Sequence, residues 1–312
     1  MVKIAFFEIS EQDKAFFRKN VNGSMVFYKE RLSLKNIEKA RGCEVVCISI
    51  YSKINKAVID KLPSLKFIAT RSTGYDHIDT RECRKRGIAV SNVPDYSNNA
   101  VAEHTFALIL ALFRNMKSVL KGVQERSKLS GAELKGKTIG VIGTGKIGMN
   151  VIRIAKGFGM KVIAYDINKN IKASHTIGFK YTSLDYLFRH ADIITLHVPY
   201  TEKTHHLINK ENINNIKKGS VIINTSRGRV IETQALIEAL DKGILAGAGL
   251  DVLEYEEKPE ECRRRFKRLF RMANVIVTPH IAACTREAMK RLREVTAKNI
   301  NAFIRGKAIN LV

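Results

Sequence analysis

Three glycines that follow a short apolar stretch are spaced as in turns that bind the phosphates of a dinucleotide. The stretch Thr138 to Ile142 reads as a buried strand, and Gly143, Gly145 and Gly148 come after it. In such a turn the first glycine permits a tight bend, the second lets the backbone approach a pyrophosphate, and the third lets the next helix pack closely. The N-terminus of that helix offers free N–H groups and a positive dipole. The spacing therefore predicts a nucleotide-binding turn.

An acidic residue at the end of the next apolar stretch indicates which nucleotide binds. Lys161 to Tyr165 reads as a second strand, and Asp166 follows it, eighteen residues after Gly148. A carboxylate at this spacing accepts hydrogen bonds from the adenosine ribose and repels a 2′-phosphate. The next residues, Ile167 and Asn168, provide no arginine for such a phosphate. We therefore expect NAD as the cofactor, rather than NADP.

Four later apolar stretches end in polar residues that suit hydride transfer to a carbonyl. Read as strands, they are Ile193 to Val198, Val221 to Asn224, Ala246 to Leu250 and Val275 to Thr278. The carboxyl ends of parallel strands meet at one edge of a sheet, where ligands bind in open α/β folds. Besides the hydride, a carbonyl needs a proton donor and a group that binds an anionic substrate. We expect both at this edge.

Three side chains at that edge suit the chemistry. His280 follows Pro279 at a strand end, and the pKa of histidine lies nearest to working pH. The planar fork of Arg227 can bond the carboxylate and the adjacent carbonyl oxygen of a 2-oxo acid. Glu256, five residues after the strand-end Asp251, can reach His280 and stabilise its imidazolium. We predict that Arg227, Glu256 and His280 are the catalytic residues.

Other histidines are alternatives to His280. His197 is the chief rival because it also lies at a strand end, but its position before Val198 and Pro199 suits contact with the cofactor. Four more were considered. His205 and His206 lie in a polar loop, and His104 lies in a helical stretch where a packed or hydrogen-bonded histidine is expected. His77 lies in the loop 71–79, where either role stays open.

The alternation of strands and helices predicts an α/β fold of two domains. The early strands, Lys3 to Phe7, Val45 to Ser49, Phe67 to Ala69 and Ala89 to Ser91, form a small unit without the glycine motif. A turn-rich connector follows, in which Asn98 or Asn99 can cap a long apolar helix from Ala100 to Lys117. The last helix, Thr285 to Arg305, leaves the nucleotide-binding domain. We expect two doubly wound parallel-sheet domains: a Rossmann NAD-binding domain of residues 101–283 inserted in a flavodoxin-like substrate domain of residues 1–100 plus 284–312.

Composition limits the remaining possibilities. The chain has 312 residues, 45% of them hydrophobic, which suits two globular domains. Its apolar runs are too short for a signal peptide or a membrane span, so we expect a cytoplasmic protein that does not bind membranes. The five cysteines form no CxxC pair, and no histidines lie near them at zinc-finger spacing; we expect reduced structural thiols and no metal site.

The net charge of +24 would attract polyanions and small anions alike. Part of the excess is the basic run from Arg263 to Arg271, which follows the acidic stretch Glu254 to Glu261. A solvated helix face with acidic partners explains the run better than a nucleic-acid site, because no interleaved aromatic residues accompany it.

Six motifs in a fixed order, spread over nearly the whole chain, resemble those of the D-isomer-specific 2-hydroxyacid dehydrogenases, nearest in pattern to the branch that includes D-lactate dehydrogenase. They are Arg71 to Asp79 (RSTGYDHID), Val101 to Thr105 (VAEHT), Gly140 to Gly148 (GVIGTGKIG), Asn224 to Gly228 (NTSRG), Leu250 to Val252 (LDV) and Thr278 to His280 (TPH). The resemblance implies an NAD-dependent interconversion of 2-oxo acids and D-2-hydroxy acids, in which Arg227 binds and polarises the substrate, His280 is the acid/base and Glu256 is its partner.

The resemblance also implies the binding residues and the assembly. In addition to the glycines, it assigns the cofactor contacts to Lys146, Ile147, Asp166, Val198, Pro199, Thr204, Thr225, Ser226 and Asp251. The backbone at Thr73 and Gly74 would hold the substrate carboxylate, and Tyr96 matches a position that can touch substrate. The family is dimeric, mainly through the nucleotide domain, so a homodimer is expected.

One departure from the family concerns specificity. After His280-Ile281-Ala282 the D-lactate branch usually carries aromatic residues, whereas this chain has Ala283 and Cys284. The hypothesis is that the pocket accepts 2-oxo acids larger than pyruvate. Cys284 also lies beside the predicted site, but its reactivity depends on a thiolate pKa that sequence does not give.

Other activities remain open. NADH-sensing corepressors share the fold, and the basic run keeps that alternative open; phosphoglycerate and glyoxylate or hydroxypyruvate activities are close neighbours. A formate-type dehydrogenase fits less well, because loss of hydride from formate needs no acid/base.

Overall fold

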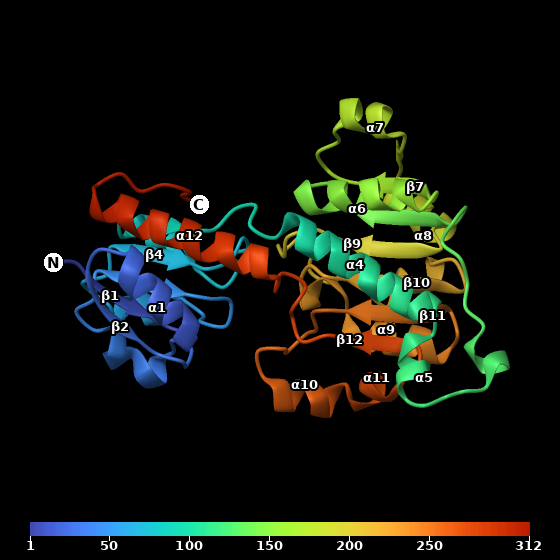
Figure 1. The fold of residues 1–312 in the computed structure, drawn as a ribbon, viewed down its shortest axis with the longest axis horizontal. Helices are drawn as coiled ribbons and strands as arrows, with labels where there is room; N and C mark the ends of the chain where they lie inside the picture. The colour runs from blue at the N-terminus through green and yellow to red at the C-terminus, as the bar shows by residue number, and fades with distance from the viewer. The chain divides into compact units, whose positions relative to one another are not determined.

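The chain forms two compact units. The computed structural model describes residues 1–312, apart from the side chains of Arg126 and Lys128. Unit 1 comprises Met1–Tyr96 and Thr285–Val312, and unit 2 comprises Ser97–Cys284. Each unit is a parallel β-sheet with helices on its faces (Figure 1). In the described part of the chain, no helix is both long and apolar enough to cross a bilayer.

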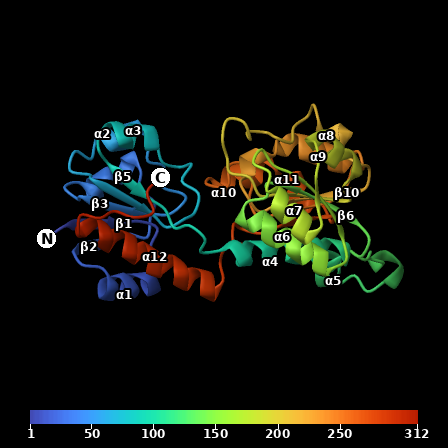
Figure 2. The same cartoon turned by 90° about the horizontal axis from the view of Figure 1, so that it is seen from above.

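Unit 1 has five parallel strands in the order β2-β1-β3-β4-β5, which is the order of flavodoxin-like folds. The strands are β1 (Lys3–Phe6), β2 (Ser24–Phe27), β3 (Val45–Ile48), β4 (Phe67–Thr70) and β5 (Ala89–Ser91). The helices are α1 (Glu11–Asn20), α2 (Lys56–Asp60), α3 (Thr80–Lys85), α12 (Arg286–Ile304) and the 3₁₀ helix η1 (Leu34–Ala40). Figure 2 shows α1 and α12 on one face of the sheet and α2 and α3 on the other.

The C-terminal helix α12 is part of the core of unit 1. Its residues Ala297 and Ile300 are buried in one apolar cluster with Phe6 of β1. Phe303 stacks on Phe67 of β4, with the ring centroids 4.5 Å apart. Helices on both faces explain why every residue of β3 and β4 is buried and why their sequences are continuously apolar rather than alternating.

Unit 2 has seven parallel strands in the order β12-β11-β10-β9-β6-β7-β8. The strands are β6 (Thr138–Ile142), β7 (Lys161–Tyr165), β8 (Lys180–Tyr181), β9 (Ile193–Leu196), β10 (Ser220–Asn224), β11 (Leu245–Leu250) and β12 (Val275–Val277). Its α-helices are α4 (Asn98–Phe113), α5 (Met116–Leu120), α6 (Lys146–Gly157), α7 (Ile171–Ile177), α8 (Leu184–His190), α9 (Thr233–Asp241), α10 (Pro259–Arg265) and α11 (Lys267–Arg271). The 3₁₀ helices are η2 (Arg126–Leu129), η3 (Ile213–Asn215) and η4 (Gly228–Val230). The two parallel sheets confirm the predicted fold class.

The order of strands in unit 2 reverses beside β6. In doubly wound sheets, such a reversal marks the expected position of a ligand. The chain runs from β6 to β7 on one side and returns to β9 on the other side. Helices α4 and α6 cover one face of this sheet, and α8 and α9 contribute to the apolar cluster on the other. The loops after β6 and β9 diverge to opposite faces, so the crevice at their carboxyl ends is the ligand position expected in doubly wound sheets.

The start of α4 differs from the sequence prediction. The helix begins at Asn98, so neither Asn98 nor Asn99 is its cap, and Ser97 is the N-cap residue without a side-chain cap hydrogen bond. Asn99 instead accepts a hydrogen bond from the Asn150 side chain of α6, at 2.6 Å. The helix also ends earlier than predicted, because Asn115 adopts a left-handed conformation and α5 follows as a separate helix.

All five cysteines are free thiols; four are buried and Cys284 is exposed. Burial raises the pKa of Cys47 to about 12 and the pKa of Cys83 and Cys262 to about 11. These three thiols therefore stay protonated and unreactive at neutral pH.

Candidate active site

Each glycine of the turn after β6 meets a different steric requirement. Gly143 has a φ of 91°, and a Cβ there would lie 2.6 Å from the carbonyl oxygen of His197. A Cβ at Gly148 would lie 2.0 Å from the carbonyl oxygen of Gly143, so only glycine lets α6 pack so closely. A Cβ at Gly145, the N-cap of α6, would meet open space. The open position at the helix N-terminus fits a pyrophosphate, whereas the other two glycines shape the turn.

Other residues predicted to bind the cofactor lie beside this turn. Lys146 and Ile147 are the first residues of α6, where backbone N–H groups have no acceptor within the helix. Asp166 directly follows β7, and its carboxylate accepts hydrogen bonds from the backbone N–H and the hydroxyl of Thr144, at 2.5 and 2.9 Å. A third bond, from the N–H of Asn168 at 2.8 Å, fixes its other oxygen. The carboxylate is thus fixed next to the glycine turn, as ribose recognition requires.

The cofactor residues predicted after β9 and β10 lie at the same edge of the sheet, since β9 pairs with both β6 and β10. Val198 and Pro199 follow β9, and the Thr204 hydroxyl donates to the Pro199 carbonyl at 2.6 Å. Thr225 follows β10, and its hydroxyl lies 3.0 Å from the Thr105 hydroxyl of α4. The hydroxyl of Thr225 is therefore engaged with α4.

The buried Asn224 at the end of β10 shapes the loop that carries Arg227. Its amide oxygen accepts hydrogen bonds from the backbone and hydroxyl of Ser226, and its amide nitrogen donates to the carbonyl of Arg227 at 2.9 Å. A Cβ on Gly228 would lie within 2.6 Å of the backbone of the turn 253–256, so glycine lets the two loops pack together. Asn224 belonged to a sequence motif, but its role in shaping this loop was not predicted.

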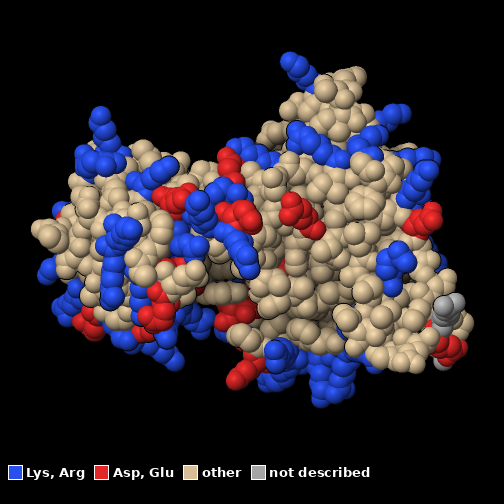
Figure 3. Space-filling view, in the orientation of Figure 1, with Lys and Arg blue, Asp and Glu red and all other residues tan. Residues whose placement is uncertain are grey.

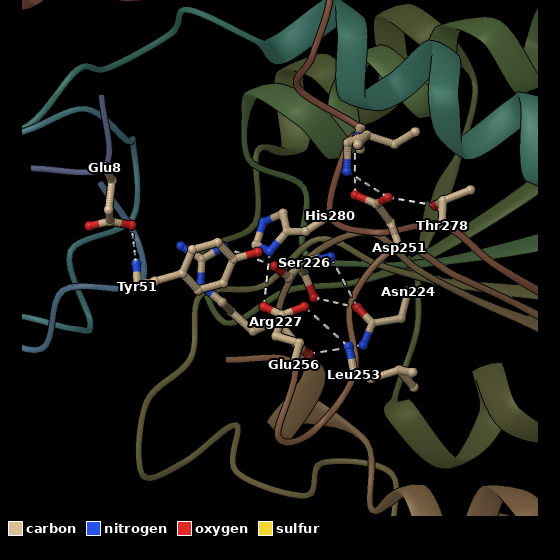
Figure 4. A network of polar contacts seen from close by, with 12 residues as sticks. Glu8, Tyr51, Asn224, Ser226, Arg227, Asp251, Leu253, Glu256, Thr278 and His280 are labelled. Carbon is tan, nitrogen blue, oxygen red and sulfur yellow. Dashed lines mark hydrogen bonds and ion pairs between the residues drawn. The ribbon is translucent and has the colours of Figure 1, made fainter. Parts of the chain in front are cut away.

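Glu256 and His280 form a pair at this edge (Figure 4). The imidazole Nδ1 lies 2.9 Å from the carboxylate Oε1, and both side chains are largely buried, with 19% and 25% of the His280 and Glu256 side chains exposed. A carboxylate only accepts hydrogen bonds, so it selects the tautomer with the proton on Nδ1 and stabilises the imidazolium. The other ring nitrogen, Nε2, remains to exchange a proton with a substrate. The pair has the form of a histidine acid/base with its orienting carboxylate.

Asp251, which is 1% exposed at the end of β11, holds the segment that carries His280. Its carboxylate accepts hydrogen bonds from the Thr278 hydroxyl at 2.5 Å and from the backbone N–H groups of Ile281 and Ala282 at 2.9 and 2.8 Å. Burial would raise the pKa of Asp251, but hydrogen bonds from the Thr278 hydroxyl, these N–H groups and His104 outweigh it and lower the pKa. The carboxylate is therefore ionised at working pH, and both its oxygens serve this segment.

His197, the rival of His280, is in a different environment. Its Nε2 lies 2.9 Å from the hydroxyl of Thr195, while its buried Nδ1 has no hydrogen-bond partner among the described atoms. Burial without a charged partner lowers the pKa of His197 to about 3. The ring is therefore neutral at working pH and cannot act as an imidazolium donor. Its carbonyl instead packs against Gly143 of the cofactor turn.

The predicted substrate-binding residues Thr73, Gly74 and Tyr96 belong to unit 1. The loop after β4 is fixed by the hydroxyl of Thr73, which donates to the carbonyl of Val93 at 2.8 Å, and by Ser72, which donates to the carbonyl of Gly74 at 2.6 Å. Among the residues that the structure describes, none accepts a hydrogen bond from the backbone N–H of Thr73 or Gly74. Two free donors in a rigid loop suit a carboxylate.

The four other histidines considered from the sequence form local contacts. His206 pairs with Glu254 at 2.9 Å, and His205 stacks on His206 with ring centroids 3.9 Å apart. His77 lies 3.1 Å from the Thr70 hydroxyl, and His104 of α4 lies 3.0 Å from the Thr278 hydroxyl.

The basic run lies on α10 and α11, and its six cations are exposed. Figure 3 shows blue side chains gathered along the lower edge of unit 2, where Figure 1 places these two helices. Two of them have acidic partners: Arg265 lies 2.8 Å from Glu261, and Arg268 lies 2.8 Å from Asp241. Arg265 also lies over the ring of Tyr255, 4.4 Å from its centroid. These contacts fit a solvated helical surface with local acidic partners.

Comparison with known protein families agrees with this site. The family model described as D-isomer specific 2-hydroxyacid dehydrogenase, NAD binding domain, matches residues 106–282. The glyoxylate reductase of Thermococcus litoralis is 39% identical over 282 residues, which are 87% of this chain and 83% of that protein. The aromatic 2-oxoacid reductase of Clostridium sporogenes is 41% identical over 279 residues, which are 85% of this chain and 84% of that protein.

Solved structures extend the likeness to both units. The D-lactate dehydrogenase of Aquifex aeolicus, in complex with NAD and lactic acid, superposes with a TM-score of 0.90 and 39% identity, over 97% of this chain and 96% of that one. Together with the family model, this similarity confirms the predicted family, the Rossmann domain, the NAD cofactor and the oxidoreductase class.

Proposed function

Because this chain belongs to the D-isomer-specific 2-hydroxyacid dehydrogenases, which are NAD-dependent oxidoreductases, we propose that it interconverts a 2-oxo acid and a D-2-hydroxy acid with His280 as the acid/base. The observation that carries the proposal is the 2.9 Å contact between His280 and Glu256, at the edge where the glycine turn opens. The rival His197 lacks such a partner and has a pKa of about 3.

The residues divide the work as follows. NAD, when bound, supplies or accepts the hydride at C2 of the substrate. Arg227 binds the carboxylate and polarises the carbonyl, because its planar fork can donate to both. His280 gives the proton on Nε2 to the carbonyl oxygen during reduction and takes it back during oxidation. Glu256 stabilises the imidazolium before it gives up this proton in reduction and after it takes the proton back in oxidation.

The proposed binding residues follow from the same assignment. Thr73, Gly74 and Tyr96 hold the substrate together with Arg227. The cofactor is held by Gly143, Gly145, Lys146, Ile147, Gly148, Asp166, Val198, Pro199, Thr204, Thr225, Ser226 and Asp251. The carboxylate of Asp166 favours NADH over NADPH, since a 2′-phosphate would meet a negative charge.

The preferred substrate is a 2-oxo acid larger than pyruvate. Two small residues, Ala283 and Cys284, support this preference. They come directly after Ala282, the last residue of the His280 segment that Asp251 holds. A relative at 41% identity is named an aromatic 2-oxoacid reductase, whereas the relative at 39% identity is a glyoxylate reductase. Because the two relatives differ, the small residues of this chain itself decide in favour of the larger substrate.

A panel of 2-oxo acids of increasing side-chain length tests the proposal. NADH oxidation is followed for each acid, and the product is resolved by chiral chromatography. We expect D-configured products and a kcat/KM that rises from glyoxylate and pyruvate to branched and aromatic acids. The highest kcat/KM with pyruvate or glyoxylate would refute the size preference, and an L-product would refute the proposed reaction.

We also propose that the protein is a cytoplasmic homodimer that pairs through unit 2. A row of exposed apolar side chains on α4 and α5 supports this: Leu110, Met116, Val119 and Leu120 are 37%, 40%, 42% and 82% exposed. A second copy would remove this apolar surface from water. Light scattering after size-exclusion chromatography should give the mass of a dimer for the wild type and of a monomer for Val119→Glu. A monomeric wild type would contradict the proposal.

A further inference from the structure

The acid/base His280 has a backbone conformation that a side-chain-bearing residue rarely adopts. Its φ is 53°, in the left-handed region. The conformation is held from the adjacent strand β11: the N–H of His280 donates to the carbonyl of Asp251 at 2.8 Å, and the next two N–H groups donate to the carboxylate of Asp251. The orientation of His280 toward Glu256 therefore depends on where the Asp251 side chain lies.

The hydrogen bonds around Asp251 can be assigned by counting protons. A threonine hydroxyl has one proton to donate, and an ionised carboxylate has none. The Thr278 hydroxyl lies 2.5 Å from Asp251 Oδ1 and therefore gives its proton to the carboxylate. Nε2 of His104 lies 3.0 Å from the same hydroxyl and 3.5 Å from Asp251 Oδ1, so it must donate. This assignment places a proton on Nε2 of His104.

His104 thereby connects α4 to the segment that carries His280. The two residues are far apart in the sequence, and α4 begins directly after the boundary at Tyr96, where the chain enters unit 2. The side chain of His104 is only 19% exposed, so its N–H has little water to bond with in place of Thr278. If this donor is lost, the oxygen of Thr278 no longer accepts a hydrogen bond from His104, and the carboxylate of Asp251 loses a nearby dipole.

We propose that His104 is a positioning residue, whose Nε2–H holds Thr278 and Asp251 so that the left-handed segment keeps His280 directed at Glu256. The inference rests on the proposed acid/base role of His280. It assigns to His104 no contact with substrate or cofactor. The consequence is that His104 affects the rate of the proton-transfer step and the rigidity of residues 280–282 far more than the binding of NADH, because the glycine turn and Asp166 lie on other segments.

Two substitutions of His104 separate positioning from packing. His104→Leu keeps the bulk and removes the donor, whereas His104→Gln puts an amide N–H near the place of Nε2. We expect His104→Leu to lower kcat at least tenfold with KM for NADH within twofold of the wild type, and His104→Gln to restore kcat to within about threefold. His175→Leu, which removes an exposed histidine of α7, is the control and should leave kcat unchanged.

A second readout needs no turnover. In hydrogen–deuterium exchange, the N–H groups of Ile281 and Ala282 should exchange at least tenfold faster in His104→Leu than in the wild type, and His104→Gln should restore their protection. If His104→Leu does not fold, Thr278→Val replaces it, because it removes the hydroxyl that His104 acts through.

The outcomes distinguish this inference from the proposed function. Exchange and kcat within twofold of the wild type in His104→Leu, or a His104→Gln variant as impaired as His104→Leu, would overturn the role of His104. If the wild type reduces no 2-oxo acid, the proposed function fails. In that case the exchange of Ile281 and Ala282 still decides whether His104 holds this segment.

Discussion

Two histidines follow strands of the same sheet but differ in every property that matters for proton transfer. His197 follows β9 and His280 follows shortly after β12. The ring of His197 has a neutral hydroxyl as its partner, and its other nitrogen is buried without one. The ring of His280 has the carboxylate of Glu256 as its partner, at 2.9 Å.

Position at a strand end is common to both histidines, and the partners of their rings distinguish them. Burial without a partner lowers the pKa of His197 to about 3, so that it stays neutral and serves as packing for the cofactor turn. The ring of His280 instead donates its Nδ1 proton to the carboxylate of Glu256, which fixes the tautomer. Contacts between loops position the His280 pair. The Asp251 carboxylate fixes the segment of His280, and Gly228 lets the loop of Arg227 approach the turn that carries Glu256.

Among the residues around His280, the largest effect is expected from removing the guanidinium of Arg227. Arg227→Gln should lower kcat/KM for 2-oxo acids about 10³-fold, comparable to the loss of one donor that stabilises a developing oxyanion. The exposed Arg229, paired with Glu257 at 3.5 Å, provides the matched control, Arg229→Gln, which should stay within about threefold. Equal losses of kcat/KM in the two variants, in steady-state kinetics, would mean that the guanidinium of Arg227 has no particular role in catalysis.

A smaller effect is expected from making the partner of His280 neutral. Glu256→Gln preserves the shape and can still accept a hydrogen bond but cannot stabilise an imidazolium, so kcat should fall roughly 10- to 100-fold. Glu257→Gln is the control at the adjacent position. If Glu256→Gln were as active as Glu257→Gln, the partner would not explain the difference between the two histidines.

The smallest effect is one of stability. The pKa of His197 is about 3, below the ordinary value near 6.5. Between these two pH values the unfolded chain binds a proton at His197 and the folded chain does not. The stability from this group is present above pH 6.5 and is lost as pH falls toward 3, by at most about 1.4 kcal/mol per pH unit. The urea midpoint of the wild type should therefore fall more between pH 7 and pH 5.5 than that of His197→Gln. Parallel midpoints would contradict the buried neutral state of His197.

Much of the nucleotide-binding sheet could be predicted from the sequence. β6 and β7 occupy the predicted residues, because parallel strands covered on both faces give continuous apolar runs. β2 and β8 were missed: β2 is an edge strand with alternating exposure, and β8 has only two residues. Such elements are determined by the neighbouring strand rather than by their own sequence.

Candidate residues could be named from the sequence, but not the contacts that support them. Glycine spacing and strand ends are local patterns, and they led to Arg227, Glu256 and His280 as the proposed catalytic residues. The positive φ of His280, the use of both oxygens of Asp251 and the donor role of His104 depend on contacts between segments far apart in the chain. The neutral state of His197 could not be predicted either, because it depends on burial.

We propose that His280, and not His197, transfers the proton. The most direct test measures NADH binding by fluorescence and NADH oxidation with the best 2-oxo acid in the same preparations of His280→Ala and His197→Gln. We expect both variants to bind NADH, His280→Ala to lose about 10²- to 10⁴-fold in kcat, and His197→Gln to stay within about fivefold of the wild type. An active His280→Ala beside an inactive His197→Gln that still binds NADH would contradict the account.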